Sequence, residues 1–173
     1  MDLYRIDNRE RTIGQIFDPQ NLFMSSLDSR RLEVEELLEF YRPEIKPSRP
    51  SALMLYEDFD AAKNHWLKQI NSKFYQVDSQ GIEILHQADS LLIEFLCENW
   101  DAREDFNEVE IAKGYWNGSF SERPIIEIFV RSATISKIIS SSEQQRMNEY
   151  KYKHQIAFPD IKPDPHIERI VKK

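Results

Sequence analysis

Glu127 interrupts the clearest strand-like run of the chain, IIEIFV. In a strand, alternation places Glu127 on the same face as Ile125 and Phe129. On a one-sided sheet that face would be solvated, but its apolar neighbours make it unlike an ordinary surface. A carboxylate held there can stabilise positive charge that develops on a ligand, so Glu127 is the first candidate for chemistry.

An arginine and a tyrosine also stand in short apolar runs, Arg5 in LYRID and Tyr56 at the end of ALMLY. An arginine can bind a diphosphate or a ribose through several charge-assisted hydrogen bonds, and a tyrosine ring can stack on a planar group. The structural alternatives are an ion pair of Arg5 with Asp7 and a core position for Tyr56. The sequence leaves both alternatives open.

Four further residues are weaker candidates for ligand binding. His86 is expected at the end of a strand, and Trp116 belongs to the turn YWNG. Arg49 and Ser51 come just before the strand of Tyr56, where they are candidates to line a phosphate. The structural alternatives are a histidine without a ligand, a packed aromatic ring, and an arginine that stiffens a connector between two prolines.

Apolar runs and amphipathic stretches alternate up to residue 139, and these elements must position the candidate side chains. Apolar and alternating runs predict strands over residues 3–6, 52–56, 74–77, 82–85, 125–130 and 133–139. Helical spacing and capping residues predict helices over residues 28–41, 58–70, 89–100 and 106–115, with a loop over residues 12–21. No strict βαβ rhythm is present. We therefore expect an α+β fold, a single domain with a bent or split, mixed or antiparallel sheet and flanking helices.

The composition changes near residue 140, where three serines lead into a polar segment. We predict a domain over residues 1–140 and a polar, proline-containing C-terminal extension over residues 141–173. Three prolines near the end forbid a continuous helix and favour an extended tail that contacts the domain or a protein partner: Pro159, Pro163 and Pro165.

Composition and charge exclude several classes of protein. With 173 residues, 40% of them hydrophobic, the chain is expected to bury one core. The net charge of −7 opposes a wide phosphate-binding surface and argues against an RNA- or nucleotide-handling enzyme. The single cysteine, Cys97, is expected to be a buried structural thiol, and no Cys/His spacing predicts a metal site. Without an apolar span or a signal-peptide pattern, we expect a cytoplasmic protein with no membrane contact.

The segments PSRPSALMLYEDFDAAKNHWLKQINSKFYQVDSQGIEILHQAD and AKGYWNGSFSERPIIEIFV resemble bacterial and phage domains of unknown function in the ADP-ribosyltransferase-like superfamily. The resemblance covers about residues 3–138 and lies in the order of its parts. These parts are an Arg or His on the first strand, a Ser or Tyr on a strand followed by a helix, and a Glu or Gln on a late strand. Arg5, Tyr56 and Glu127 match them in that order. The late strand is similar to that of toxin ADP-ribosyltransferases that modify DNA.

This resemblance implies an NAD-dependent ADP-ribosyltransferase or NAD-glycohydrolase of a bacterial or phage conflict system, with NAD as substrate and a macromolecular acceptor of unknown kind. Glu127 would promote cleavage of the nicotinamide–ribose bond, while Arg5 and Tyr56 would hold NAD. The remaining candidates for contact with NAD are Arg49, Ser51, Trp116 and His86.

Two departures from better-known members qualify the expected activity. The first strand carries no histidine, and Ile125 rather than Glu or Gln stands two residues before Glu127, which disfavours arginine of a protein as the acceptor. The departures leave room for a second hypothesis, a non-catalytic binding or interaction module on the same fold. In that case the segment 143–173 would contact a protein partner.

Overall fold

The protein is described by a computed structural model, which defines residues 1–19 and 27–157. Its centre is a seven-stranded sheet in the order β2-β7-β4-β1-β3-β6-β5, and the neighbouring strands run antiparallel. The α+β class expected from the sequence is therefore confirmed. The strands are β1 Leu3–Asp7, β2 Ile16–Phe17, β3 Leu53–Tyr56, β4 Lys73–Val77, β5 His86–Asp89, β6 Ile126–Val130 and β7 Ala133–Ser140.

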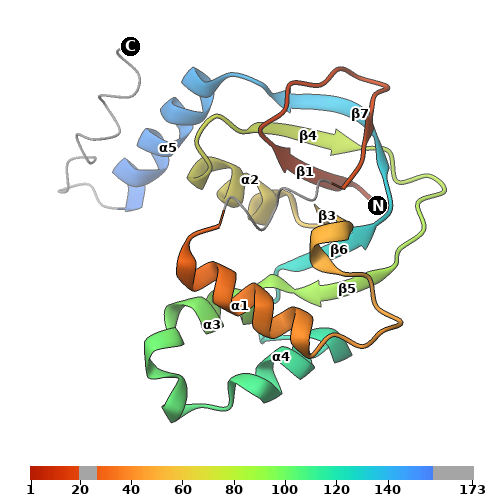
Figure 1. The fold of residues 1–173 in the computed structure, drawn as a ribbon. Helices are drawn as coiled ribbons and strands as arrows, with labels where there is room; N and C mark the ends of the chain where they lie inside the picture. The colour runs from red at the N-terminus through yellow and green to blue at the C-terminus, as the bar shows by residue number, and fades with distance from the viewer. Residues whose placement is uncertain (20–26, 158–173) are drawn as a thin grey trace.

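The helices form two groups on the sheet. Figure 1 shows α1, α3 and α4 together beside β5 and β6, while α2 and α5 lie beside the part of the sheet that contains β4. The α-helices of the described residues are α1 Ser29–Phe40, α2 Phe59–Lys68, α3 Ser90–Glu98, α4 Glu108–Asn117 and α5 Glu143–Ala157, and the short 3₁₀ helices are η2 Arg49–Ser51 and η3 Trp100–Asp105.

The sheet has one weak junction, between β1 and β3. These two strands pair at a single position, Tyr4 opposite Tyr56, whereas β1 and β4 pair at five positions. The junction therefore divides the sheet into β2-β7-β4-β1 and β3-β6-β5. Strands that separate beyond one shared pair leave backbone groups that side chains can reach.

Three apolar clusters hold the layers together. One cluster contains only strand residues from both parts of the sheet, among them Leu3, Leu55, Val77 and Ile128, and packs these parts against each other. A second joins α1, α3 and α4 to β5 and β6, and a third joins α2 to β1 and β4. The helices thus fix both sides of the weak junction.

Aspartates start three of the helices, as the sequence predicts. Asp28, Asp58 and Asp89 each accept a hydrogen bond from a backbone N–H in the first turn of α1, α2 and α3. Gly118 ends α4 with a φ of 78°, a left-handed conformation that glycine adopts without strain. These local signals gave the helix boundaries to within a few residues.

The strand expected over residues 82–85 is wrong. This segment has no regular structure, and β5 instead begins at His86. The apolar residues of this segment suggested a strand, but Ile84 is exposed and the pairing with β6 spans only His86 to Asp89. The loop expected over residues 12–21 contains the two-residue strand β2, which pairs with β7.

The polar segment after residue 140 forms a helix, α5, that packs on α2. Arg146 and Met147 are buried there, and Nη1 of Arg146 donates to the carbonyl oxygen of Leu67. The expected extended tail with Pro159, Pro163 and Pro165 lies outside the described residues. Across residues 1–19 and 27–157, no helix has both the length and the apolar character needed to cross a bilayer.

Candidate functional site

A cavity of about 1270 Å³ lies beside the weak junction of the sheet. Its wall includes residues of β1, β3 and β6 together with parts of α1, α2 and α3. Arg5, Tyr56 and Glu127, which the sequence analysis singled out, all line this cavity, and so does Arg49. The volume exceeds the roughly 300–1,000 Å³ of common small-molecule pockets.

Strand register brings Tyr56 and Glu127 together. Tyr56 on β3 is directly opposite Glu127 on β6, and Tyr4 on β1 is opposite Tyr56 on its other side. Residues directly opposite each other point to the same face of a sheet. Burial, followed by the negative charge of Glu127, raises the pKa of Tyr56, so its hydroxyl stays protonated.

Arg5 reaches the cavity by spanning the weak junction. Its Nη1 donates to the carbonyl oxygen of Met54 at 2.9 Å, and its Nε and Nη2 lie 3.3 and 3.2 Å from Oδ2 of Asp7. Asp7 also accepts hydrogen bonds from the backbone and side chain of Arg9. The ion pair of Arg5 with Asp7, which the sequence offered as an alternative role, is therefore present, and it orients Arg5 in the cavity wall.

Burial by itself would raise the pKa of Asp7, but Arg9 and Arg5 outweigh that effect and lower it. Asp7 is therefore a firmly ionised anchor for both arginines at neutral pH. Because Arg5 and Arg9 both line the cavity, the anchored pair presents two guanidinium groups on one wall.

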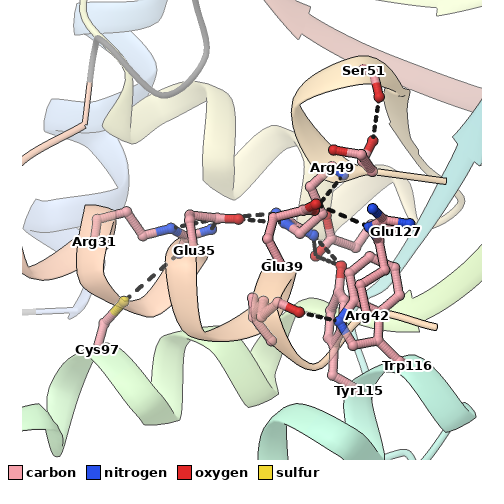
Figure 2. A network of polar contacts seen from close by, with 12 residues as sticks. Arg31, Glu35, Glu39, Arg42, Arg49, Ser51, Cys97, Tyr115, Trp116 and Glu127 are labelled. Atoms are coloured by element: carbon pink, nitrogen blue, oxygen red, sulfur yellow. Dashed lines mark hydrogen bonds and ion pairs between the residues drawn. The ribbon is translucent and has the colours of Figure 1, made fainter. Parts of the chain in front are cut away.

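Glu127 belongs to a buried polar network, drawn in Figure 2. Only 3% of Glu127 is exposed, and its Oε1 lies 3.1 Å from Nη1 of Arg49 and 3.4 Å from the hydroxyl of Tyr115. On its other side Arg49 is held by Glu35 of α1, with Nε to Oε2 at 2.7 Å. Arg49 also donates to the hydroxyl of Tyr115.

The electrostatics of this network keep Arg49 charged. Burial alone would lower the pKa of Arg49, but the negative charges of Glu127 and Glu35 outweigh burial and raise it well above the ordinary value. Burial also raises the pKa of Tyr115, which therefore remains a neutral hydroxyl. Arg49 is thus a permanent cation that lies between the two carboxylates, and Glu35 is paired with Arg31 as well.

His65 on α2 adds an uncharged ring to the cavity wall. Burial, and then the positive charges of Arg31, Lys68 and Arg5, lower the pKa of His65 to about 4. Its ring centre lies 5.3 Å from that of Tyr56. At neutral pH the cavity therefore contains two neighbouring aromatic rings without charge.

The other sequence candidates lie away from the cavity lining. Ser51 is exposed and bonds to the carbonyl of Ser48. His86 is stacked on Trp116 with ring centres 5.3 Å apart, and Trp116 is fully buried, donating from Nε1 to the carbonyl of Leu38.

Cys97, expected as a buried thiol, is half-buried and lines the cavity near Arg31.

Sequence reasoning missed Glu35, Tyr115 and His65. A signal for Glu35 was present, because it stands three residues after Leu32 and three before Leu38, on the apolar face of the predicted helix. A charged residue at that position indicates a buried partner. Nothing in the sequence indicated that the partner is Arg49.

Comparison of the sequence with protein-family models finds no match, and comparison with curated proteins finds no significant match.

Proposed function

We propose that the chain is an NAD-dependent ADP-ribosyltransferase or NAD-glycohydrolase with Glu127 as its catalytic residue. The observation that carries the proposal is the shared cavity of Arg5, Tyr56 and Glu127, which come from three different strands. The superfamily resemblance requires these residue types in one cleft. A cavity of about 1270 Å³ provides the space that a dinucleotide needs.

The cations of the cavity support an anionic ligand. The protein as a whole has a net charge of −7, whereas the cavity lining is close to balanced, with six Lys and Arg side chains and five Asp and Glu side chains. A diphosphate is bound by Lys and Arg side chains through charge-assisted hydrogen bonds. These cations are Arg5, Arg9, Arg30, Arg31, Arg49 and Lys68.

The proposed reaction breaks the bond between the ribose C1′ and the nicotinamide nitrogen. Nicotinamide leaves as a neutral molecule with the bonding electron pair, and positive charge develops on the ribose. The carboxylate of Glu127 stabilises this charge. A nucleophile, either water or an acceptor group, then bonds to C1′ and releases one proton. Tyr56 and the neutral ring of His65, which line the cavity side by side, would contact the planar nicotinamide.

One observation favours the second candidate function, a non-catalytic module that binds a nucleotide. Glu127 is 3% exposed and already paired with Arg49, so part of its charge is neutralised before any ligand arrives. A pocket that only binds would need no exposed carboxylate. The two functions share the cavity and differ in whether NAD is cleaved.

The deciding experiment is nicotinamide release from labelled NAD by the full chain, with water, protein, DNA and RNA offered as acceptors. The wild-type protein is expected to release nicotinamide, and Glu127→Gln is expected to lower the rate by about 100- to 1,000-fold, as for loss of a charge-stabilising group. Because Gln keeps an oxygen that can accept from Arg49, a thermal melt should show that the variant is folded at the assay temperature.

Glu83→Gln is the matched control, because Glu83 forms an exposed pair with Arg131 outside the cavity lining. This variant should keep the wild-type rate. If the wild-type protein binds NAD in a calorimeter but releases no nicotinamide with any acceptor, the binding module is correct. Absence of both binding and release refutes the enzyme and any module that binds NAD.

A further inference from the structure

We propose that Glu35 is a positioning residue that orients the carboxylate of Glu127 through the guanidinium of Arg49. Glu35 lies on α1, does not line the cavity, and is fully buried. Its kinetic consequence rests on the proposed function of Glu127, whereas the geometric claim stands without it.

The contact between Glu35 and Arg49 is bidentate. Nε of Arg49 lies 2.7 Å from Oε2 of Glu35, and Nη2 lies 3.3 Å from Oε1. The same Oε1 accepts from Nε of Arg31 at 3.0 Å. Two parallel hydrogen bonds fix the plane of a guanidinium, so Arg49 cannot rotate while Glu35 is ionised.

The fixed plane decides which atom of Arg49 faces Glu127. With Nε and Nη2 committed to Glu35, Nη1 is the atom that contacts Oε1 of Glu127, at 3.1 Å. Figure 2 shows Arg49 held between Glu35 on one side and Glu127 on the other. Among the described residues no donor contacts Oε2 of Glu127, and Glu127 forms part of the cavity wall. One oxygen is thus anchored and the other is left for a ligand.

Two aromatic rings restrict Arg49 further. The centre of its guanidinium lies 5.3 Å from the ring centre of Tyr115 and 5.6 Å from that of Phe129. These contacts limit sliding of the guanidinium but do not set its charge balance. Glu35 supplies the second negative charge, so Glu127 is not the sole counter-ion of a buried arginine.

Among the described residues, neutralising Glu35 would leave Glu127 as the one carboxylate that forms an ion pair with the guanidinium of Arg49. Arg49 would then draw both oxygens of Glu127 onto itself and away from the cavity. If Glu35 had only a structural role, its substitution would lower the stability of the protein and leave the kinetics of the folded fraction unchanged. The two roles therefore differ in kcat and in the state of the Glu127 carboxylate.

The test compares Glu35→Gln with Glu35→Asp and with Glu36→Gln, an exposed neighbour on the same helix. For nicotinamide release per folded protein, Glu35→Gln should lower kcat by roughly 10- to 100-fold with KM for NAD nearly unchanged, as misplacement of a reacting group does. Glu35→Asp keeps the charge and should recover part of the lost kcat. Glu36→Gln should behave as wild type.

A second readout needs no activity. In NMR spectra of the protein without NAD, the Arg49 Nε–Hε signal and the Glu127 carboxylate ¹³C signal should both shift in Glu35→Gln and stay in place in Glu36→Gln. Arg49→Lys assigns the first signal and Glu127→Gln the second. If both signals shift but no variant, wild type included, releases nicotinamide, the proposed function is wrong and the positioning is correct.

Unchanged signals in Glu35→Gln would overturn the positioning role. A wild-type kcat for folded Glu35→Gln would overturn it equally. If Glu35→Gln fails to fold, Glu35→Asp decides, because its shorter carboxylate must displace Arg49 and shift the Glu127 signal if the proposal is correct.

Discussion

Tyr56 on β3 lies directly opposite Glu127 on β6. The same row continues to Tyr4 on β1 and to Ala88 on β5, so it crosses the weak junction of the sheet. Only one paired position holds β1 and β3 together, and the cavity lies beside it. The sheet thus places a tyrosine and a carboxylate side by side at the point where its backbone pairing is least complete.

Arg5 spans that junction, and the several N–H donors of its planar guanidinium should matter more for NAD binding than its charge. Nη1 contacts the carbonyl of Met54 while Nε and Nη2 contact Asp7, a division that a lysine cannot reproduce. We expect Arg5→Lys to raise KM for NAD about 10-fold, equal to about 1.4 kcal/mol of binding, with a smaller effect on kcat. Steady-state kinetics of nicotinamide release measures both constants.

Arg131→Lys is the control for Arg5→Lys, since the side chain of Arg131 is 77% exposed and lies outside the cavity lining. It should leave both constants at the wild-type value. An unchanged KM in Arg5→Lys would show that Arg5 serves the sheet junction rather than the ligand.

His86 should make the protein lose stability in mildly acidic solution. Burial, and then the charge of Lys46, lower the pKa of His86 to about 4, whereas an unfolded histidine titrates near 6.5. The unfolded chain therefore binds the proton first, so the stabilisation is complete above about pH 6.5 and is lost as the pH falls toward 4. Urea unfolding at pH 7, 6 and 5 should show that the free energy of unfolding decreases as the pH falls.

His86→Gln removes the titrating ring, so the free energy of unfolding should decrease less between pH 7 and 5 than in the wild type. His65→Gln serves as a comparison, because the pKa of His65 is also lowered to about 4 and should contribute to the same window. An equal decrease in the wild type and in both variants would mean that neither histidine is responsible.

Local signals in the sequence predicted much of the fold. The alternation around Glu127 predicted β6, and the capping aspartates located the starts of α1, α2 and α3. Such signals depend on neighbours within a few residues. The strand expected over residues 82–85 was wrong because pairing with β6, rather than apolar character, decides which residues join the sheet.

The sequence named residues that share the cavity wall only where the order of parts along the whole chain was used. Arg5, Tyr56 and Glu127 line one cavity, whereas His86 and Trp116 stack on each other in the core. The network around Arg49 joins residues of α1, α4 and β6 that no local pattern connects. A pairing of this kind depends on how helices pack, which the sequence alone did not reveal.

Asp89 should contribute more to stability than an ordinary helix cap. It is fully buried, and its carboxylate accepts backbone hydrogen bonds from Leu91, Ile125 and Ser121 at 3.0, 3.0 and 2.8 Å. One bond caps α3 and two tie the segment before β6 to β5. Asp89→Ala would leave three backbone donors unpaired, so we expect a loss of about 3–5 kcal/mol in the free energy of unfolding.

Asn107 provides the matched comparison, because it caps α4 with a single bond to the N–H of Glu110 at a solvent-exposed position. Asn107→Ala should cost only about 1 kcal/mol, the usual value for loss of a cap. Urea unfolding measures the difference between the two losses, provided that the free energy of unfolding depends on urea concentration with the same slope in both variants. The loss of free energy of unfolding in Asp89→Asn should lie between those of Asp89→Ala and Asn107→Ala, because an amide keeps only one acceptor oxygen. Equal losses in Asp89→Ala and Asn107→Ala would mean that the two hydrogen bonds before β6 contribute nothing beyond the cap.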